Sequence, residues 1–390
     1  MVVKKVAFCE AGFDIFYGAQ QSLYTFLANV DKEKIDPVVL CPGNGEFTDQ
    51  VSKIGLEVSV VKQPDIFDQK GNVLNKKGLS NKFNTVIGFL KHVKKYMSYY
   101  KEEKIDLVYC NDIRSILTSG LAARLRRLPV IWYVRIDKDL GIFNWIAANI
   151  ATQVVTIADS LQTMFPKRFI YNSSKKFSTI YTGINLEEVD SIVPVNLRDE
   201  LKLSDDTRLV ALIGSIQPRK GQKDFIEAIK NINTEMENTK FLIVGDLLNE
   251  THKDYLNEIK ETIRKNNLED DVIFLGKRED VISIMKQIDL VVLPSYSEGL
   301  PRTILESFSC SCPVIATNVA GASEIITNRK NGILIKPGDI NELAESMLYL
   351  VKDKKRLSIM GLEGRKCIEN KFTLTGYIKS LENLIVTEAK

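Results

Sequence analysis

Short apolar runs rich in β-branched residues alternate with helical patterns along the whole chain of 390 residues. The length of each run is typical of a buried strand, and polar or helical segments separate one run from the next. The predicted strands are 2–9, 35–41, 56–61, 107–111, 129–134 and 153–157, and then 209–213, 240–244, 272–275, 290–293 and 313–316. Such alternation predicts βα units and parallel sheets, and hence an α/β fold.

The predicted strands form two groups, separated by a region around residues 181–202 that contains acidic residues and Pro194. We therefore predict two doubly wound, Rossmann-like parallel-sheet domains that face each other across a cleft, with a hinge near residues 189–196. The predicted domains are 1–192 and 193–370, and residues 371–390 are expected to form a helix that packs back toward the first domain. Because ligands bind at the carboxyl ends of the strands in such folds, the active site is expected between the domains.

Length and composition narrow the class of protein. The chain is too long for one compact core, and its apolar content of 44% is typical of a soluble globular protein. The first residues resemble a buried strand and not a signal peptide. The most apolar stretch, residues 141–158, contains Asn144, Asn149, Gln153 and Thr156, which a spanning helix would not favour. These features predict a cytoplasmic protein without a membrane span.

Cysteine and histidine usage argues against a bound metal. The cysteines, at 9, 41, 110, 310, 312 and 367, lack paired metal spacing, and histidine occurs only at 92 and 252. Buried reduced thiols are the simplest interpretation. The pair Asp137 and Asp139 resembles a metal-binding D-x-D motif but follows the wrong kind of element. We therefore expect no metal and no cofactor.

The net charge of +3 predicts no nucleic-acid partner, but the charge is unevenly distributed. Residues 53–135 hold sixteen Lys plus Arg against seven Asp plus Glu, a difference of nine. Residues 62–81 are expected to form a long flexible loop of the kind that often selects an acceptor. The next helix, from about residue 83 to residue 100, has one apolar face and several lysines. Packing on its sheet is the favoured interpretation, and peripheral contact with an anionic membrane is the minority hypothesis.

The richest segment for function runs from residue 289 to residue 339. A buried strand ends at Pro294-Ser295, a loop carries Glu298, and Pro301 precedes a helix in which Glu306 lies about one turn further along. The N–H groups of residues 299–304 are expected to point out of the helix start, where they favour phosphate. The Glu306 carboxylate can accept two hydrogen bonds from a vicinal diol such as a ribose. Together these features predict a nucleotide-sugar pocket.

The order of motifs in this segment resembles the retaining glycosyltransferases of family four, whose fold is called GT-B. The motifs that carry the resemblance are Glu298 to Glu306, Pro313 to Thr317, Gly321 with Glu324, Asn331-Gly332 and Pro337 to Asp339. The resemblance is strong after residue 209 and weaker before it. It implies a catalytic role for Glu298, which would orient sugar hydroxyls beside the reacting carbon, and a ribose-binding role for Glu306.

Other positions match the family pattern only in part. Lys220 matches a basic residue that binds the donor diphosphate, whereas the family's arginine is replaced by Ser215, and Arg219 is expected to compensate. The remaining expected donor contacts are Gly18, Gly299, Leu300, Thr303 and Ile304. Weaker expectations are base contacts at Gly245, Lys277 and Arg278. On the acceptor side they are Tyr17, which replaces a family glycine, together with Asn111 and Arg135.

The resemblance implies a metal-independent, retaining transfer of a hexose or N-acetylhexosamine from a nucleoside diphosphate sugar, with UDP favoured over GDP, to an acceptor hydroxyl. The expected acceptor is a glycan or lipid-linked glycan of a bacterial surface polysaccharide pathway, so the enzyme is expected in the cytoplasm or at the inner face of the plasma membrane. Two alternatives remain open. One is a non-catalytic GT-B scaffold or partner subunit, suggested by Ser215 and Tyr17, and the other is a nucleotide-sugar epimerase.

Overall fold

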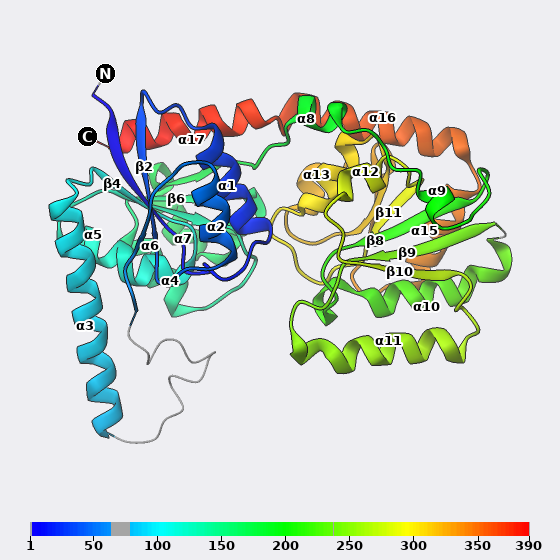
Figure 1. Ribbon diagram of the computed structural model, residues 1–390, viewed down its shortest axis with the longest axis horizontal. Coiled ribbons are helices and arrows are strands. Elements are labelled where there is room, and N and C mark those ends of the chain that lie inside the picture. Colours follow the sequence, from blue (N-terminus) through cyan, green and yellow to red (C-terminus); the bar gives the residue numbers. More distant parts are fainter. Residues whose placement is uncertain (1, 64–78, 237, 390) are drawn as a thin grey trace. The chain divides into compact units, whose positions relative to one another are not determined.

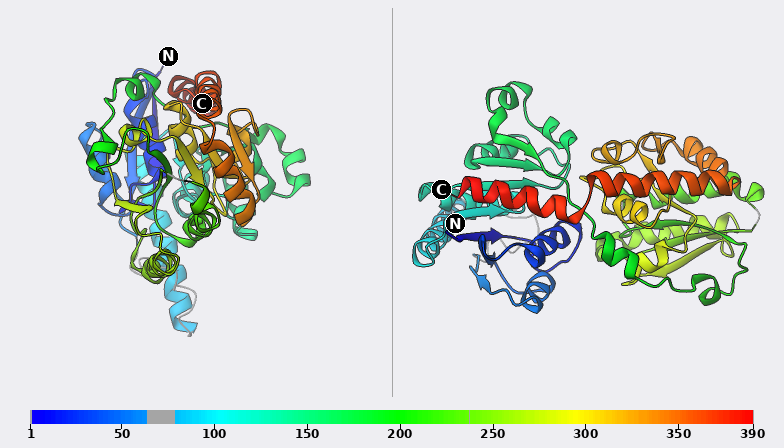
Figure 2. Two further views of the ribbon diagram at one scale, coloured as in Figure 1. Left: turned by 90° about the vertical axis from the view of Figure 1, so that its right-hand side faces the viewer. Right: turned by 90° about the horizontal axis from the view of Figure 1, so that it is seen from above.

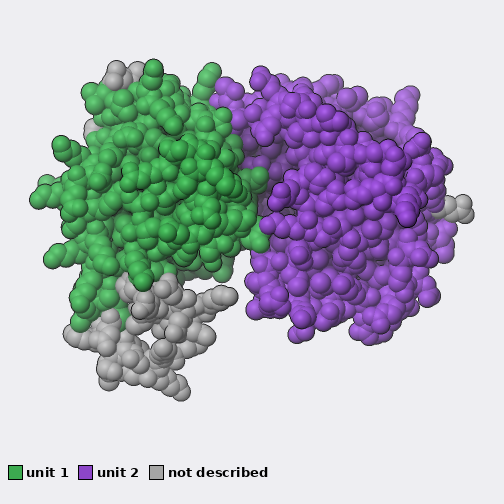
Figure 3. All heavy atoms as spheres, viewed as in Figure 1, with its two compact units in different colours: residues 1–181, 377–390 green, residues 182–376 purple. Residues whose placement is uncertain are grey.

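The structure is a computed structural model that describes residues 2–63, 79–236 and 238–389 (Figure 1). Most of the predicted loop at residues 62–81 lies outside them. Contacts group the chain into two compact units, unit 1 with residues 1–181 and 377–390 and unit 2 with residues 182–376 (Figure 3). The first boundary thus precedes the predicted one at residue 192. Residues 182–192 group with unit 2 because they bind its other elements: Ile184 N donates to Phe372 O at 2.8 Å, Arg365 Nη1 donates to Asp190 Oδ1 at 2.8 Å, and Lys286 donates to Ile192 O.

Unit 1 is built on a sheet in which the described strands all run parallel, in the order β3-β2-β1-β4-β5-β6-β7. The strands are β1 (Lys4–Cys9), β2 (Ile35–Cys41), β3 (Val58–Val60), β4 (Leu107–Cys110), β5 (Val130–Val134), β6 (Gln153–Thr156) and β7 (Phe177–Thr179). Its helices are α1 (Gly18–Asn29), α2 (Glu46–Lys53), α3 (Leu79–Glu102), α4 (Ile113–Ser115), α5 (Leu121–Leu125), α6 (Ile142–Ile150) and α7 (Lys167–Asn172), with the π-helical turn η3 (Ile116–Gly120) and the 3-10 turns η4 (Asp159–Met164) and η5 (Ser174–Lys176).

Unit 2 has a second parallel sheet, in the order β10-β9-β8-β11-β12-β13. The strands are β8 (Arg208–Ile213), β9 (Thr239–Val244), β10 (Val272–Gly276), β11 (Leu290–Leu293), β12 (Val314–Thr317) and β13 (Gly332–Ile335). The helices are α8 (Leu186–Ser191), α9 (Leu197–Glu200), α10 (Gln222–Ile232), α11 (Lys253–Lys265), α12 (Val281–Met285), α13 (Arg302–Ser309), α14 (Ala322–Ile325), α15 (Ile340–Val351) and α16 (Lys354–Lys371), with the 3-10 turns η6 (Pro218–Lys220), η7 (Asn233–Glu235) and η8 (Glu250–His252).

These two sheets confirm the predicted α/β class with two Rossmann-like units. Two strands escaped prediction. β7 is a half-buried edge strand of three residues, and β13 begins at Gly332, inside a stretch that the sequence analysis treated only as a motif. β7 lacks the continuous apolar run of a central parallel strand, whereas β13 contains a short one, Ile333 to Ile335, that the sequence analysis did not assign to a strand.

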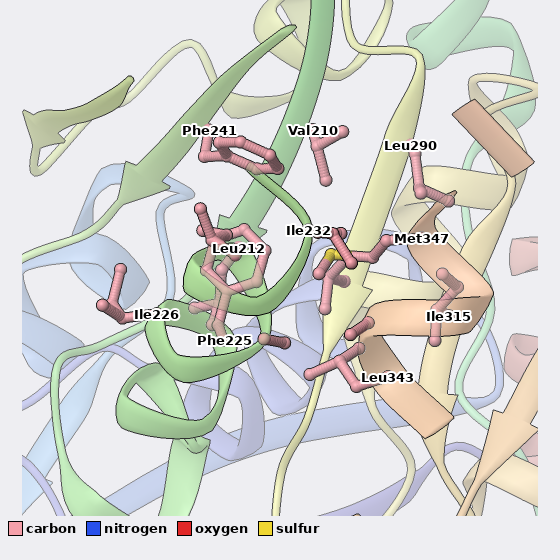
Figure 4. Close-up of a cluster of buried hydrophobic side chains, with 14 of the residues drawn as sticks. Val210, Leu212, Phe225, Ile226, Ile232, Phe241, Leu290, Ile315, Leu343 and Met347 are labelled. Atoms are coloured by element: carbon pink, nitrogen blue, oxygen red, sulfur yellow. The ribbon is translucent and has the colours of Figure 1, made fainter. Parts of the chain in front are cut away.

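The core of unit 2 explains how its strand ends are held in place. Side chains from β8, β9 and β11 pack against α10 and α15, as shown for Leu212, Phe225, Phe241 and Met347, which are fully buried (Figure 4). Strands covered on both faces in this way leave their carboxyl ends as the accessible edge of the sheet. The loops that follow β8 and β11 are therefore fixed at their bases.

The last helix, α17 (Leu374–Glu388), contributes residues 377–390 to unit 1 (Figures 1 and 2). The Tyr377 hydroxyl donates to Ser22 O at 3.2 Å, and the buried Glu382 carboxylate accepts from Asp31 N at 2.7 Å. Leu381 and Ile385 are fully buried. Unit 1 is thus assembled from two segments that are far apart in the sequence.

Helix α3 packs on its sheet through Val93, Tyr96 and Tyr100, which are buried, as the favoured interpretation of its apolar face predicts. Val86 and Leu90, on the same predicted face, are 55% and 59% exposed because the helix extends beyond the sheet (Figure 1). Within the described parts of the chain, no helix combines the length and the apolar character that crossing a bilayer requires. All six cysteines are free, and four of them are buried.

Candidate functional site

The predicted segment after β11 forms a loop and then α13, with Pro301 as the residue that precedes the helix. Among the described residues, the N–H groups of Gly299, Leu300, Arg302 and Thr303 have no hydrogen-bond acceptor. The predicted donor at Ile304 is different. Its N–H donates to Pro301 O at 3.0 Å because the first turn tightens into an i→i+3 bond, so this group is already occupied. Four N–H donors therefore remain for a ligand at this turn.

Glu298 lies beside Lys220 and Arg219, the two basic residues that the sequence analysis assigned to the donor diphosphate. Lys220 Nζ donates to Glu298 Oε1 at 2.7 Å, and Arg219 Nη1 lies 3.4 Å from Oε2. Lys220 and Glu298 are largely buried, whereas Arg219 is half-exposed. The structure thus brings together three residues that are about eighty positions apart in the chain.

Close packing of two loops holds this cluster. Gly221, with φ of +70°, ends the η6 turn, and a Cβ at this position would lie 2.1 Å from Pro294 O. Only glycine allows this backbone approach without strain. A further bond from Tyr296 N to Arg219 O, at 2.8 Å, joins the same loops. The Lys220–Glu298 distance is therefore set by backbone contacts as well as by the ion pair.

The charges of the cluster balance in part. Burial would raise the pKa of Glu298, but the nearby Lys220 and then Arg219 outweigh it, so that the pKa lies below its usual value. Glu298 is consequently ionised and neutralises one of the two cations. An anionic ligand at the α13 turn would meet the remaining positive charge together with the four N–H groups.

Ser215 occupies the first position after Gly214 at the end of β8, where the family carries an arginine. Its hydroxyl accepts from Gln217 Nε2 at 2.7 Å, and its carbonyl accepts from Gln222 Nε2 at 3.0 Å. The side chain of Lys220 passes 3.6 Å from the position of a Gly214 Cβ. Ser215 therefore helps to shape the loop that carries Lys220, and its predicted donor contact stays a prediction.

Glu306, the residue expected to hold the ribose, forms an ion pair within its own helix. Arg302, four residues earlier on α13, donates to Glu306 Oε1 from Nε at 3.1 Å and lies 3.0 Å from it through Nη2. Sequence reasoning missed Arg302, although the i, i+4 spacing of opposite charges was visible. Arg302 contacts only Oε1, so Oε2 takes no part in this ion pair.

Arg278 lies in a loop that, by the resemblance, was expected to hold the base through main-chain groups, and its side chain is engaged elsewhere. Its guanidinium donates to Asp280 from Nε at 2.8 Å and to Glu200 from Nη1 at 2.5 Å, so it is held by two carboxylates. Gly245 follows β9 with φ of +139°, and its N–H donates to Gly276 O at 2.8 Å. Arg278 is thus engaged in joining elements within unit 2, and base recognition would fall to main-chain groups.

Some residues of the family motifs stabilise the scaffold and do not form part of the site. The side chain of Asn331 accepts from Thr327 N at 2.7 Å and donates to Ile325 O at 3.1 Å, which fixes a turn. Asp339 caps α15 by accepting from Glu342 N at 3.0 Å. These residues position the strand and helix next to the site without facing it.

In unit 1, Asn111 and Arg135 come together at the carboxyl ends of β4 and β5. Arg135 Nε donates to Asn111 Oδ1 at 2.6 Å, and its Nη2 donates to the Tyr109 hydroxyl at 3.0 Å. Arg135 is 7% exposed, and its Nη1 is buried with no partner among the described residues. Tyr17 is exposed and precedes α1, whose first residue is Gly18.

Sequence reasoning missed Glu10 as a member of this acceptor-side cluster. Its Oε2 accepts from Asn111 Nδ2 at 2.5 Å and its Oε1 accepts from Gly12 N at 2.6 Å. Burial, and then the charge of Asp112, raises the pKa of Glu10 to about 7. The available signal was its place directly after the first strand, the edge where ligands bind in parallel sheets.

No group of three or more His, Cys, Asp or Glu side chains with the arrangement of a metal site occurs in the part of the chain that the structure describes. Glu298 pairs with Lys220 and Arg219, and Glu306 pairs with Arg302.

Comparisons with known proteins point in one direction. The family model "Glycosyl transferases group 1" matches residues 196–367. A UDP-Gal:alpha-D-GlcNAc-diphosphoundecaprenol alpha-1,3-galactosyltransferase of Escherichia coli is 28% identical over 77% of this chain and 81% of its own. The capsular polysaccharide biosynthesis glycosyltransferase CapM of Staphylococcus aureus is 26% identical over 77% of this chain and 82% of its own.

Solved structures agree on the fold. The crystal structure of Anabaena Alr3699/HepE in complex with UDP superposes with a TM-score of 0.81 at 21% identity, covering 99% of this chain and 100% of that one. A sucrose-phosphate synthase from Thermosynechococcus elongatus superposes with a TM-score of 0.72 at 18% identity, covering 98% and 99%. Both matches span the two units.

Proposed function

We propose that this chain, a glycosyltransferase whose residues 196–367 match the family model "Glycosyl transferases group 1", transfers a hexose or N-acetylhexosamine from a UDP-sugar to an acceptor hydroxyl with retention of the anomeric configuration. The acceptor that we propose is a lipid-linked glycan of a bacterial surface polysaccharide pathway. UDP is favoured because the relatives and solved structures described above include a UDP-Gal-dependent enzyme and a UDP complex.

The observation that carries the proposal is the Lys220–Glu298 pair, 2.7 Å apart and largely buried, beside a helix start with four unpaired N–H groups. A nucleoside diphosphate offers two negative phosphates to that arrangement. Lys220 and Arg219 would take up the charge that develops on the diphosphate as the glycosidic bond breaks, and the N–H groups of Gly299 to Thr303 would hold its oxygens.

Glu298 would exchange its contact with Lys220 for hydroxyl groups of the transferred sugar once the diphosphate binds the lysine. In a retaining reaction on one face, the acceptor oxygen forms the new bond to the anomeric carbon while the bond to the leaving phosphate breaks. The acceptor's proton then passes to a phosphate oxygen. No catalytic histidine is needed for this step. Glu306, directed by Arg302, would accept hydrogen bonds from the ribose through Oε2.

Unit 1 supports the proposed acceptor class and a place at the inner face of the plasma membrane. The charged residues that line a hollow of about 550 Å³ between α3 and β3 are four lysines, Lys62, Lys91, Lys94 and Lys95, and one acidic residue, Glu102. Such a concentration of positive charge favours anionic lipid headgroups. The minority hypothesis of membrane contact through α3 is therefore kept as a proposal.

Calorimetric titration in the presence of a chelator tests the donor site. UDP, GDP and ADP would be titrated into the wild type, into Glu306→Ala and into Glu345→Ala, which removes an exposed glutamate of α15 in the same unit. We expect UDP to bind the wild type and Glu345→Ala equally, and Glu306→Ala about tenfold more weakly, because one ribose contact is lost. Failure of all three nucleotides to bind would favour a non-catalytic partner subunit.

Turnover is measured separately with UDP-sugars and lipid-linked or soluble glycan acceptors. Transfer with retained configuration supports the proposal. Conversion of the donor in the absence of any acceptor would instead indicate an epimerase.

A further inference from the structure

Helix α6 carries its large apolar side chains on the outside of unit 1. The exposed residues are Ile142 at 66%, Phe143 at 49% and Trp145 at 49%. The side chains that face the interior are small or polar, namely Asn144, Ala147 and Ala148, which are 3%, 0% and 0% exposed. We call the exposed residues Ile142, Phe143 and Trp145 the α6 apolar face.

This arrangement is the reverse of an ordinary surface helix, whose apolar stripe faces the core. Scattered exposed apolar residues are normal, but three large ones on one short helix are not. Ile136, in the loop just before the helix, adds another side chain that is 62% exposed. Moreover, no Asp, Glu, Lys or Arg occurs from residue 140 to residue 158. The surface of α6 is therefore uncharged as well as apolar.

The orientation of α6 is fixed by specific bonds. Gly141 has φ of +57°, and its N–H donates to Asp139 Oδ1 at 2.7 Å where the helix begins. Asn144 Nδ2 donates to Lys138 O at 3.3 Å from the buried side of the helix. Rotation that would bury the apolar face would break the Asn144 bond and bring Ile142, Phe143 and Trp145 into the space now filled by two alanines. The apolar face is thus a built feature of unit 1.

We propose that the α6 apolar face enters the interfacial region of a lipid bilayer. Tryptophan and phenylalanine with neighbouring isoleucines are the side chains that interfacial helices place in lipid. Complementary charge is available in the same unit, where residues 53–135 carry a surplus of nine positive charges and where the lysine hollow by α3 lies. Apolar insertion together with attraction to anionic headgroups provides the two signals that stable peripheral binding requires.

The position of α6 connects this surface to the acceptor side. Arg135, at the end of β5, precedes Ile142 by seven residues, and β5 and α6 are in contact. An inserted α6 would hold that strand end near the lipid headgroups, where the glycan of a membrane-anchored acceptor emerges. This inference rests on the proposed lipid-linked acceptor and names the surface that brings the enzyme to it.

The two tryptophans of the chain provide a direct test. Trp132 is buried at 3% exposure in β5, whereas Trp145 is on the α6 apolar face. In Trp132→Phe, Trp145 is the sole tryptophan. We expect its emission to shift to shorter wavelength when vesicles of phosphatidylglycerol and phosphatidylcholine are added, and to be quenched by phospholipids brominated on their acyl chains. In Trp145→Phe, the emission of the buried Trp132 is expected to stay unchanged, which makes this variant the matched control.

A second measurement compares vesicle sedimentation of two double variants. Ile142→Ser with Phe143→Ser is expected to lower the partition into vesicles at least tenfold. Ile359→Ser with Leu362→Ser removes two apolar side chains of α16, each 53% exposed, and is expected to leave it unchanged. Circular dichroism checks that both variants remain folded. If the first pair fails to fold, the Trp145 emission alone decides.

Three results would overturn the proposal. The first is that the protein does not bind these vesicles, and the second is that it binds while Trp145 emission stays constant. The third is a wild type that self-associates in sedimentation velocity and becomes monomeric in Ile142→Ser with Phe143→Ser, since the face would then be a contact between copies of this chain. UDP titration and transfer to a soluble acceptor in the same variants separate these results from failure of the proposed function.

Discussion

Glu298 differs from an ordinary site carboxylate because it stands between the two cations that would bind the donor. Its contact with Lys220 at 2.7 Å and its proximity to Arg219 at 3.4 Å hold both side chains before a ligand arrives. In the proposed function, a diphosphate would compete with this buried carboxylate for the same positive charge. The carboxylate would then weaken the binding of the nucleotide and would become free to bind sugar hydroxyls only when the nucleotide is bound.

Replacement of this carboxylate should separate binding from turnover. In Glu298→Gln we expect transfer to fall at least about 100-fold, because the sugar loses a charged hydrogen-bond partner near the reacting carbon. UDP affinity is expected to stay constant or to rise by up to about tenfold, because Lys220 and Arg219 lose their competing anion. Calorimetry and a transfer assay measure the two effects, with Glu345→Gln as the control. Weaker UDP binding would mean that Glu298 contacts the nucleotide itself.

Glu10 should make stability depend on pH in unit 1. Its folded pKa of about 7 lies above the value of 4.5 for an unperturbed glutamate, so the folded state binds the proton more tightly. Its effect on stability is constant below about pH 4.5 and becomes less favourable as the pH rises to about 7. Compared with Glu10→Gln, the free energy of unfolding of the wild type is therefore expected to fall by on the order of 1–3 kcal/mol between pH 5 and pH 8. Urea unfolding at both pH values measures this difference. If the difference in free energy of unfolding between the two proteins is the same at pH 5 and pH 8, Glu10 keeps an ordinary pKa.

For individual residues, the sequence analysis predicted those that belong to a motif. It did not predict those that come together only in the folded chain. Glu298, Lys220 and Arg219 belong to strand-end loops with glycine and proline on either side, so their meeting could be expected. Glu10 also follows a strand and Arg302 lies four residues before Glu306, but no motif names either residue, because one acts through a neighbouring strand and the other through its own helix. The N–H of Ile304 was misjudged because the tightening of a first helical turn depends on local backbone angles.

Among the elements, the turn before α13 depends on a neighbouring glycine. Gly321 has φ of +74°, and a Cβ there would lie 1.9 Å from Gly299 O. The close approach sets the path of residues 299 and 300, whose N–H groups are unpaired in the described structure. The glycine thus acts on the donor site without belonging to it.

Gly321→Ala is expected to weaken UDP binding at least about tenfold, because Gly299 must move by more than a bond length to relieve the clash. Gly55→Ala in unit 1 is the matched control, since Gly55 has φ of +75° but nothing within 4 Å of a Cβ. In both variants the alanine has a positive φ, which costs about 1 kcal/mol of stability. Thermal unfolding measures this loss of stability. Equal UDP affinity in the two variants would contradict the role of the Gly299 turn.

Central strands were predictable because burial on both faces produces continuous apolar runs, such as Leu290 to Leu293. β7 was not, because its three half-buried residues form no such run, and the short apolar run of β13 was treated only as part of a motif. Helix α6 could be recognised as apolar, but the direction of its apolar face depends on which side chains the sheet and the η3 turn leave room for. That direction is a property of packing and not of periodicity.

For the whole molecule, α17 makes the stability of unit 1 depend on the last residues of the chain. Leu381 is fully buried in unit 1, and Met347 is fully buried in the core of unit 2. We expect each substitution to alanine to cost about 2–5 kcal/mol in its own unit. In calorimetry with and without UDP, Leu381→Ala should lower the transition that UDP does not shift, and Met347→Ala should lower the one that it does. A single transition affected equally by both variants would indicate that the units unfold together.

The division of unit 1 into two segments also has a consequence for synthesis on the ribosome. Unit 2, residues 182–376, is complete in sequence before residues 377–390 are made, whereas unit 1 waits for them. At about 5–20 residues per second, the 209 residues from 182 to 390 take roughly 10–40 s to translate. Throughout that interval, the surface that α17 will cover is open in the nascent chain. The first segment to be made is therefore the last to acquire its complete core, and the nascent chain is most exposed to chaperones there.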